Sequence, residues 1–104
     1  MTVLTAGDLA DFRRLRNRYL RYGKRAISGA VEGRYNSLNV RVRRAVSDLP
    51  EEYQHIARLY WIDALTCVAI SFRTYYSERH VRRLKNSARS IMLSETSCDT
   101  REHV

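Results

Sequence analysis

The side chains best suited to chemistry in this 104-residue chain are arginines and an asparagine that recur near its C-terminal end. On a helix spanning residues 77–92 they share one polar face, formed by Arg79, Arg82, Arg83 and Asn86. The guanidinium fork of arginine pairs bidentately with guanine O6 and N7, and the amide of asparagine pairs with adenine N6 and N7. These four residues are therefore predicted to contact base edges in the major groove of double-stranded DNA.

A second set of polar residues flanks that face and is suited to phosphate oxygens. Contacts of this kind position a protein on the duplex and make its binding sensitive to salt, without selecting a sequence. The predicted DNA-backbone contacts are Arg73, Thr74, Tyr76, Ser77, His80, Lys85 and Arg89. His80 is also placed to cap the start of its own helix. Tyr75 and Tyr76 are interpreted as packing residues rather than as stacking platforms for bases.

Two short helices joined by a tight corner are expected to position these groups. Thr66 and Ser77 stand where each helix needs an N-cap, and the acidic Glu78 suits the positive end of the second helix dipole. The apolar residues of the second helix recur at spacings of three and four, which predicts one buried stripe along it. This stripe consists of Val81, Leu84, Ala88 and Ile91. The pattern is typical of a helix-turn-helix reader of DNA.

Three segments carry a resemblance to a known family: LPEE at 49–52, LYWIDALT at 59–66 and YSERHV at 76–81. In this order they resemble region 4 of sigma-70 factors. They are more similar still to phage-encoded regulators of the ArpU/RinA type, in which a related motif opens the recognition helix. The resemblance covers about residues 38–92, a little over half of the chain.

The resemblance implies an all-α fold, a small helical domain with a sigma-70 region 4-like helix-turn-helix and an extra basic N-terminal helix. It implies a phage or prophage activator of late or packaging genes. It also implies RNA polymerase as a partner, contacted through the 50–62 helix or the N-terminal helix. Helix-turn-helix proteins often bind DNA as dimers, so a homodimer is a further expectation, held only slightly above a monomer.

The rest of the chain is expected to form an N-terminal helix, a loop and two supporting helices. The first helix begins after Thr5 or Asp8, ends near Arg25 and buries a stripe of apolar residues. That stripe consists of Leu9, Phe12, Leu15, Tyr19 and Tyr22. Its many arginines suit a solvated face, a phosphate-binding arm or an RNA-binding segment. Residues 27–39, with two glycines and two asparagines, are predicted to form a loop or broken helix.

Three parts follow from this pattern. Residues 1–36 form the basic helix and loop, residues 37–93 the helix-turn-helix domain, and residues 94–104 a polar tail expected to be disordered. Within the second part, 40–48 resumes helical spacing, and a helix that starts at Pro50 buries Trp61.

Composition narrows the function classes. The formal net charge of +8 favours a polyanionic partner. Cys67 and Cys98 form neither a paired motif nor a metal-ligand set with the scattered histidines, so no metal and no cofactor are expected. No acid–base pair or activated nucleophile can be assembled, so an enzyme is not expected. With neither a membrane-length apolar run nor a signal peptide, the expected location is the bacterial cytoplasm, at the nucleoid.

Three other classes stay open. A small terminase-like DNA-packaging subunit with a helix-turn-helix would form a ring. An RNA-binding antiterminator would use the arginine-rich helix at 13–25 and prefer RNA. A protein-only interaction module would not bind nucleic acid at physiological salt.

Overall fold

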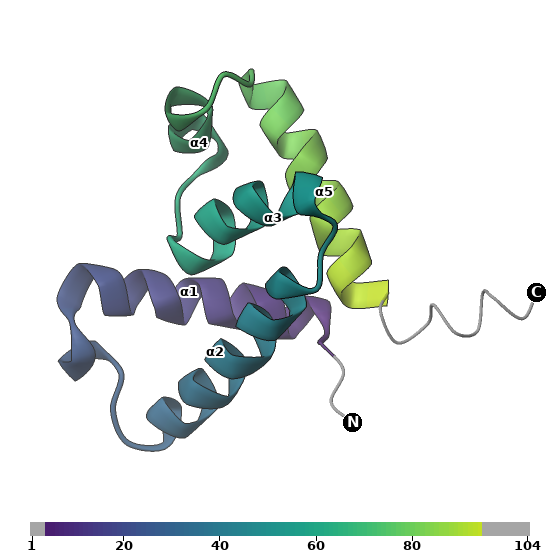
Figure 1. Cartoon of the computed structure of the whole chain (residues 1–104). Coiled ribbons are helices and arrows are strands. Elements are labelled where there is room, and N and C mark those ends of the chain that lie inside the picture. The colour runs from purple at the N-terminus through teal and green to yellow at the C-terminus, as the bar shows by residue number, and fades with distance from the viewer. Residues whose placement is uncertain (1–3, 95–104) are drawn as a thin grey trace, which may run out of the picture.

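The computed structural model describes residues 4–94, which fold as a small all-helical domain (Figure 1). The elements are α1 Ala6–Tyr22, the 3-10 turn η1 Lys24–Ala26, α2 Ala30–Ser47, α3 Glu51–Ala57, the π-helical turn η2 Arg58–Ile62, α4 Cys67–Arg73 and α5 Glu78–Ser94. The predicted all-α class is confirmed. The tail predicted at 94–104 lies, after Ser94, outside the described residues.

Local interactions set both ends of α1. Thr5 and Asp8 form a capping box, in which the Thr5 hydroxyl accepts the Asp8 N–H at 3.1 Å and the Asp8 carboxylate accepts the Thr5 N–H at 3.1 Å. The helix ends three residues earlier than expected, at Tyr22, because Gly23 adopts a φ of 86° that residues with a side chain rarely take. Tyr22, predicted to be buried, is exposed beyond this end of the stripe.

The loop predicted over 27–39 is wrong for most of its length, because α2 begins at Ala30 and continues without a break to Ser47. Gly33 lies inside the helix, where glycine costs about 1 kcal/mol relative to alanine. Burial of Tyr35 and Leu38 offsets that cost, since the Tyr35 ring stacks between Phe12 and Tyr19 at centroid distances of 5.9 and 5.6 Å. Only residues 27–29 separate α2 from η1.

The larger of two hydrophobic cores joins the N-terminal helices to the helices that follow. It contains Phe12 from α1, Leu38 and Val42 from α2, Trp61 from η2 and Met92 from α5. The expectation that Trp61 is a core residue is confirmed. A second, smaller cluster lies under the corner and consists of Ile56, Leu59, Cys67, Ile70 and Val81. The α4–α5 corner therefore rests on a core of its own, at the end of the molecule far from α2 (Figure 1).

Two arginines of α1 hold the link between η2 and α4. The Arg16 Nε donates to the Ile62 carbonyl oxygen at 2.7 Å, and its Nη1 donates to the Tyr35 hydroxyl at 2.8 Å. The Arg13 Nη2 donates to the Leu65 carbonyl oxygen at 3.0 Å. Carbonyls at the end of a helix need such donors. These two arginines are partly buried and belong to the internal structure, so the expectation of a fully solvated basic face on α1 is wrong for them.

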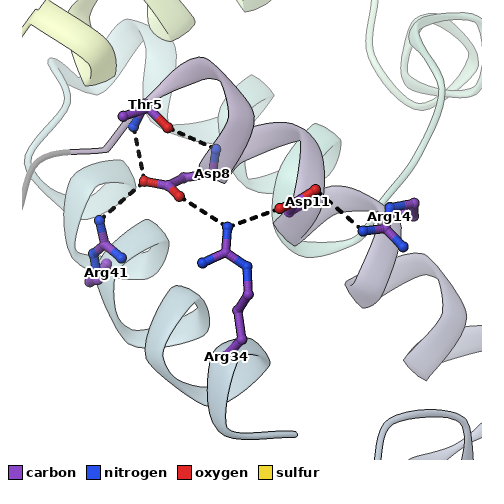
Figure 2. A network of polar contacts seen from close by, with 6 residues as sticks. All are labelled: Thr5, Asp8, Asp11, Arg14, Arg34 and Arg41. Atoms are coloured by element: carbon purple, nitrogen blue, oxygen red, sulfur yellow. Dashed lines mark hydrogen bonds and ion pairs between the residues drawn. The ribbon is translucent and has the colours of Figure 1, made fainter. Parts of the chain in front are cut away.

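Asp8 and Asp11 on α1 face α2 and bind its arginines, as Figure 2 shows. Arg34 bridges the two carboxylates at 3.1 Å to Asp8 and 2.9 Å to Asp11, and Arg41 reaches Asp8 at 3.2 Å. Desolvation by burial raises the pKa of Asp8. Bonds from the Thr5 N–H, Arg34 and Arg41 outweigh it and hold the pKa below its ordinary value of 3.8. This network ties α1 to α2, and Asp11 also binds Arg14 of α1 itself at 3.3 Å (Figure 2).

Candidate nucleic-acid interface

The corner between α4 and α5 is built by hydroxyl groups. The Thr66 hydroxyl accepts the Ala69 N–H at 3.1 Å at the start of α4, and the Ser77 hydroxyl accepts the His80 N–H at 3.2 Å at the start of α5. Both predicted N-caps are therefore confirmed. Between them, the Thr74 hydroxyl donates to the Ile70 carbonyl oxygen at 3.0 Å. It also accepts the Tyr76 N–H at 3.3 Å. The hydroxyls predicted to contact the DNA backbone at Thr74 and Ser77 thus hold the corner itself.

The four predicted base contacts do not share equal surroundings on α5. At about 100° per residue, Arg79, Arg83 and Asn86 fall within roughly 60° of one another, opposite the buried Val81 and Ala88. All three are exposed. They form what we call the outward face of α5, the surface that a groove of DNA would meet first.

Arg82 lies beside this face and is paired with an acid. Its Nε donates to a Glu78 carboxylate oxygen at 3.1 Å, and its Nη2 donates to the same oxygen. The hydrogen bond and charge of Glu78 raise the pKa of the Arg82 guanidinium. Both side chains are largely exposed, so such a pair is worth only a few tenths of a kcal/mol. Arg82 can therefore exchange Glu78 for a nucleic-acid acceptor at little cost.

The remaining predicted backbone contacts divide between the two flanks of α5. On one flank, the His80 ring meets the Tyr76 ring edge-on at 4.6 Å, and the His80 Nδ1 lies 2.8 Å from the Arg83 Nη2. On the other flank, Lys85 and Arg89 line a hollow against α1. Arg73 is exposed at the end of α4. The backbone-contact residues therefore border the outward face on both sides and at the corner.

The interpretation of Tyr75 as a packing residue is wrong. Its side chain is fully exposed, at 108 % of the reference area, and Phe72 is 84 % exposed. Phe72 lies on the side of α4 away from Ile70, and Tyr75 falls in the corner after the last turn, so neither reaches the small core below. Both side chains are therefore in solvent, on either side of Arg73 along the chain.

The sequence offers a phosphate-binding arm only for the arginine-rich helix as a whole and does not predict which of its arginines meets α5. Arg13 of α1 lies beside Lys85 and Arg89 of α5 in the same hollow, although more than seventy residues separate it from them in sequence. Spacing along the chain carries no signal for such a meeting, since only the packing of α1 against η2 and α5 produces it.

Comparisons of this chain with protein-family models, with curated proteins and with solved structures gave no match. Among residues 4–94, no helix is long and apolar enough to cross a bilayer.

Proposed function

We propose that this protein is a sequence-specific, double-stranded DNA-binding transcriptional regulator, an activator of phage or prophage late or packaging genes. The observation that carries the proposal is the outward face of α5, where Arg79, Arg83 and Asn86 stand together, exposed, on a 17-residue helix that follows a capped corner. Groups that read guanine and adenine are thereby presented on one rigid element.

In the proposed complex, α5 enters the major groove with its first two turns nearest the bases. Arg79 and Arg83 pair with guanine, Asn86 pairs with adenine, and Arg82 leaves Glu78 for a base or phosphate. Each bidentate pair contributes about 1–3 kcal/mol of discrimination against the wrong base. The net charge of +8 adds a salt-dependent attraction that does not depend on sequence.

Selection of bound duplexes from a random pool tests this proposal, with wild type, Arg83→Ala and Arg18→Ala compared. Arg18 is exposed on α1 and forms no ion pair within the described residues, so it is a control that removes the same charge. We expect a defined site for wild type and for the control. Arg83→Ala should lose preference at one base pair, by roughly 5- to 150-fold, while it keeps most non-specific affinity.

A selection without a consensus, together with an Arg83→Ala variant that changes only the salt dependence, would refute sequence reading by α5. Preference for RNA would then favour an antiterminator, a ring in solution a packaging subunit, and no binding at physiological salt a protein-only module. The antiterminator is the less favoured alternative, because Arg13 and Arg16 of its proposed RNA-binding segment 13–25 already donate to backbone carbonyl oxygens within the domain.

The proposal includes RNA polymerase as a partner, a homodimer, a role without catalysis and a location at the bacterial nucleoid. The polymerase contact rests on the resemblance to sigma-70 region 4, and the dimer rests on the general behaviour of helix-turn-helix proteins. Sedimentation of the free protein and the half-site spacing in selected DNA test the dimer. Co-purification with purified polymerase holoenzyme, with and without the selected site, tests the contact.

A further inference from the structure

A hollow of about 150 Å³ lies between the first half of α1, η2 and the second half of α5. Ala6 and Ala10 leave room on the α1 side, and the rings of Tyr60 and Trp61 form the floor. Since one water molecule takes up roughly 30 Å³ of liquid, the hollow has space for a tetrahedral oxyanion with part of its hydration.

Three cations converge on this hollow from two helices. Arg13 reaches it from α1, and Lys85 and Arg89 reach it from α5. The guanidinium carbon of Arg13 lies 4.1 Å from the centroid of the Tyr60 ring, and the Lys85 Nζ lies 5.1 Å from the same centroid. These two charges are therefore no more than about 9 Å apart, a separation at which like charges at a protein surface still repel.

No carboxylate of the described residues 4–94 pairs with these three cations. None of the residues that line the hollow is acidic, and within residues 4–94 none of its three cations forms an ion pair. Lys85 donates to the Asn86 side-chain oxygen at 2.8 Å, which is a neutral acceptor. The nearby acids of α1, Asp8 and Asp11, turn toward α2 and are bound there (Figure 2).

Two contacts hold Arg13 in place at the hollow. Its Nη2 donates to the Leu65 carbonyl oxygen at 3.0 Å, and its guanidinium carbon lies over the Tyr60 ring. Its Nε is buried and out of reach of a ligand, so only the remaining donors of the guanidinium are available to an anion. A fixed guanidinium, two further cations and two aromatic rings therefore form a positively charged recess suited to an oxyanion.

We propose that this hollow binds a phosphate oxyanion, gripped by Arg13, Lys85 and Arg89. Only the source of the phosphate rests on the proposed function: in the DNA complex it is a backbone phosphate beside the groove that α5 enters. Because Arg13 is anchored to the link that precedes α4, the bound phosphate also fixes α5 relative to α1. The hollow thus makes the N-terminal helix part of the DNA-binding surface.

Trp61, the single tryptophan of the chain, lines the hollow and reports on it directly. Its fluorescence and its indole N–H resonance are followed while sodium phosphate replaces sodium chloride at constant ionic strength. The first test variant is the double replacement Lys85→Gln with Arg89→Gln. Its control is the double replacement Arg18→Gln with Arg44→Gln, which removes the same charge from exposed positions on α1 and α2. Arg89→Gln alone is the second test variant, because Arg89 is exposed and its replacement leaves the core intact.

We expect a saturable response to phosphate in wild type and control. The phosphate affinity should be at least tenfold weaker in the two variants of the hollow, called the pocket variants below. The DNA arm measures the salt dependence of binding to a duplex of random sequence, so that it does not depend on base reading by Arg83. A plot of the logarithm of the binding constant against the logarithm of the salt concentration gives a slope for each protein. If the phosphate comes from DNA, this slope is less steep by about 0.9 in the pocket variants than in the control, the value for one lost phosphate contact.

A phosphate response with an unchanged DNA slope would support the oxyanion site and assign it to a free phosphate or phosphomonoester. Equal responses in pocket variants and control, or no response in wild type, would overturn the proposal. If selection from random DNA still gave a defined site alongside such a result, the regulator proposal would stand, so the two failures are distinguishable.

Discussion

Replacing Arg16 with methionine tests whether α1 holds the link that leads into the α4–α5 corner. Methionine keeps the aliphatic volume of the side chain and removes both hydrogen bonds of the guanidinium. The Ile62 carbonyl oxygen then loses its donor at 2.7 Å, and the Tyr35 hydroxyl loses its donor at 2.8 Å. Arg13, which binds the next part of the link at Leu65, is left in place.

The magnitude follows from the charge and burial of these bonds. A hydrogen bond from a charged donor contributes about 1.5–3 kcal/mol, and more is lost where a buried acceptor is left unpaired. Arg16 is only partly buried, so water replaces part of what is lost and the lower end applies to each bond. We expect the free energy of unfolding to fall by about 2–4 kcal/mol, a large fraction of the ~5–15 kcal/mol typical of a domain.

Urea unfolding followed by circular dichroism measures the change, and Arg18→Met is the control. Arg18 lies two residues away on the same helix, is exposed and has no polar partner in the described residues, so its replacement should change the free energy of unfolding by less than about 0.5 kcal/mol. The melting temperature of Arg16→Met should drop by roughly 10–20 °C. The dependence on urea should keep its slope, because the surface exposed on unfolding is the same.

A double-mutant cycle with Tyr35→Phe isolates one of the two bonds. The coupling between Arg16 and Tyr35 should be about 1 kcal/mol, since Tyr35 is 5 % exposed and its hydroxyl has a single charged partner. Equal unfolding free energies for Arg16→Met and Arg18→Met would refute the reasoning. A coupling energy of zero would show that the bond to Tyr35 adds nothing and leave only the Ile62 carbonyl.

Three further perturbations follow from local geometry. Wild type should lose stability on acidification, and Asp8→Asn should lose less. The reason is that a carboxyl whose pKa is held below 3.8 stabilises the fold above that pH, and this stabilisation disappears as pH falls toward the lowered pKa. Chemical denaturation between pH 5 and 2.5 measures it (a range set by the ~3.9 of a free Asp), and parallel curves for the two proteins would contradict it. Ser77→Ala should cost about 1 kcal/mol through loss of the α5 cap, with Ser77→Asp as a control that keeps the acceptor; equal melting temperatures for both would exclude the cap as a source of stability. Ala64→Gly should raise the melting temperature by a few degrees, because Ala64 has a φ of 59° in the turn before α4, and a lowered value would mean that its methyl packing outweighs the strain.

Interactions that span four residues or fewer could be predicted from the sequence. The caps at Thr66 and Ser77 are confirmed, since a cap depends on neighbours within one turn. In the predicted stripe of α5, Val81 and Ala88 are buried, and Leu84 and Ile91 are partly buried. The all-helical class follows from the same periodicity. Even α2 has a readable signal, because Tyr35, Leu38 and Val42 follow helical spacing from within the segment predicted as a loop or broken helix.

Packing between distant segments decided the rest. Gly33 locally favours a loop, whereas the burial of Tyr35, which favours the helix, depends on rings of α1 that the local sequence does not reveal. The arginines of α1 look alike along the chain, yet Arg16 binds the Ile62 carbonyl oxygen 46 residues away while Arg18 remains in solvent. A guanidinium becomes structural or free according to which acceptor the fold brings within about 3 Å of it.

The same distinction applies to the candidate interface. Its outward face on α5 is a property of one helix and follows from sequence periodicity, whereas the phosphate hollow is formed by α1 and α5 together. Arg13, Lys85 and Arg89 become one site only because Tyr60 and Trp61 pack between their helices. Helical periodicity predicts which side of a helix is polar, but the convergence of charges from two helices depends on how those helices pack.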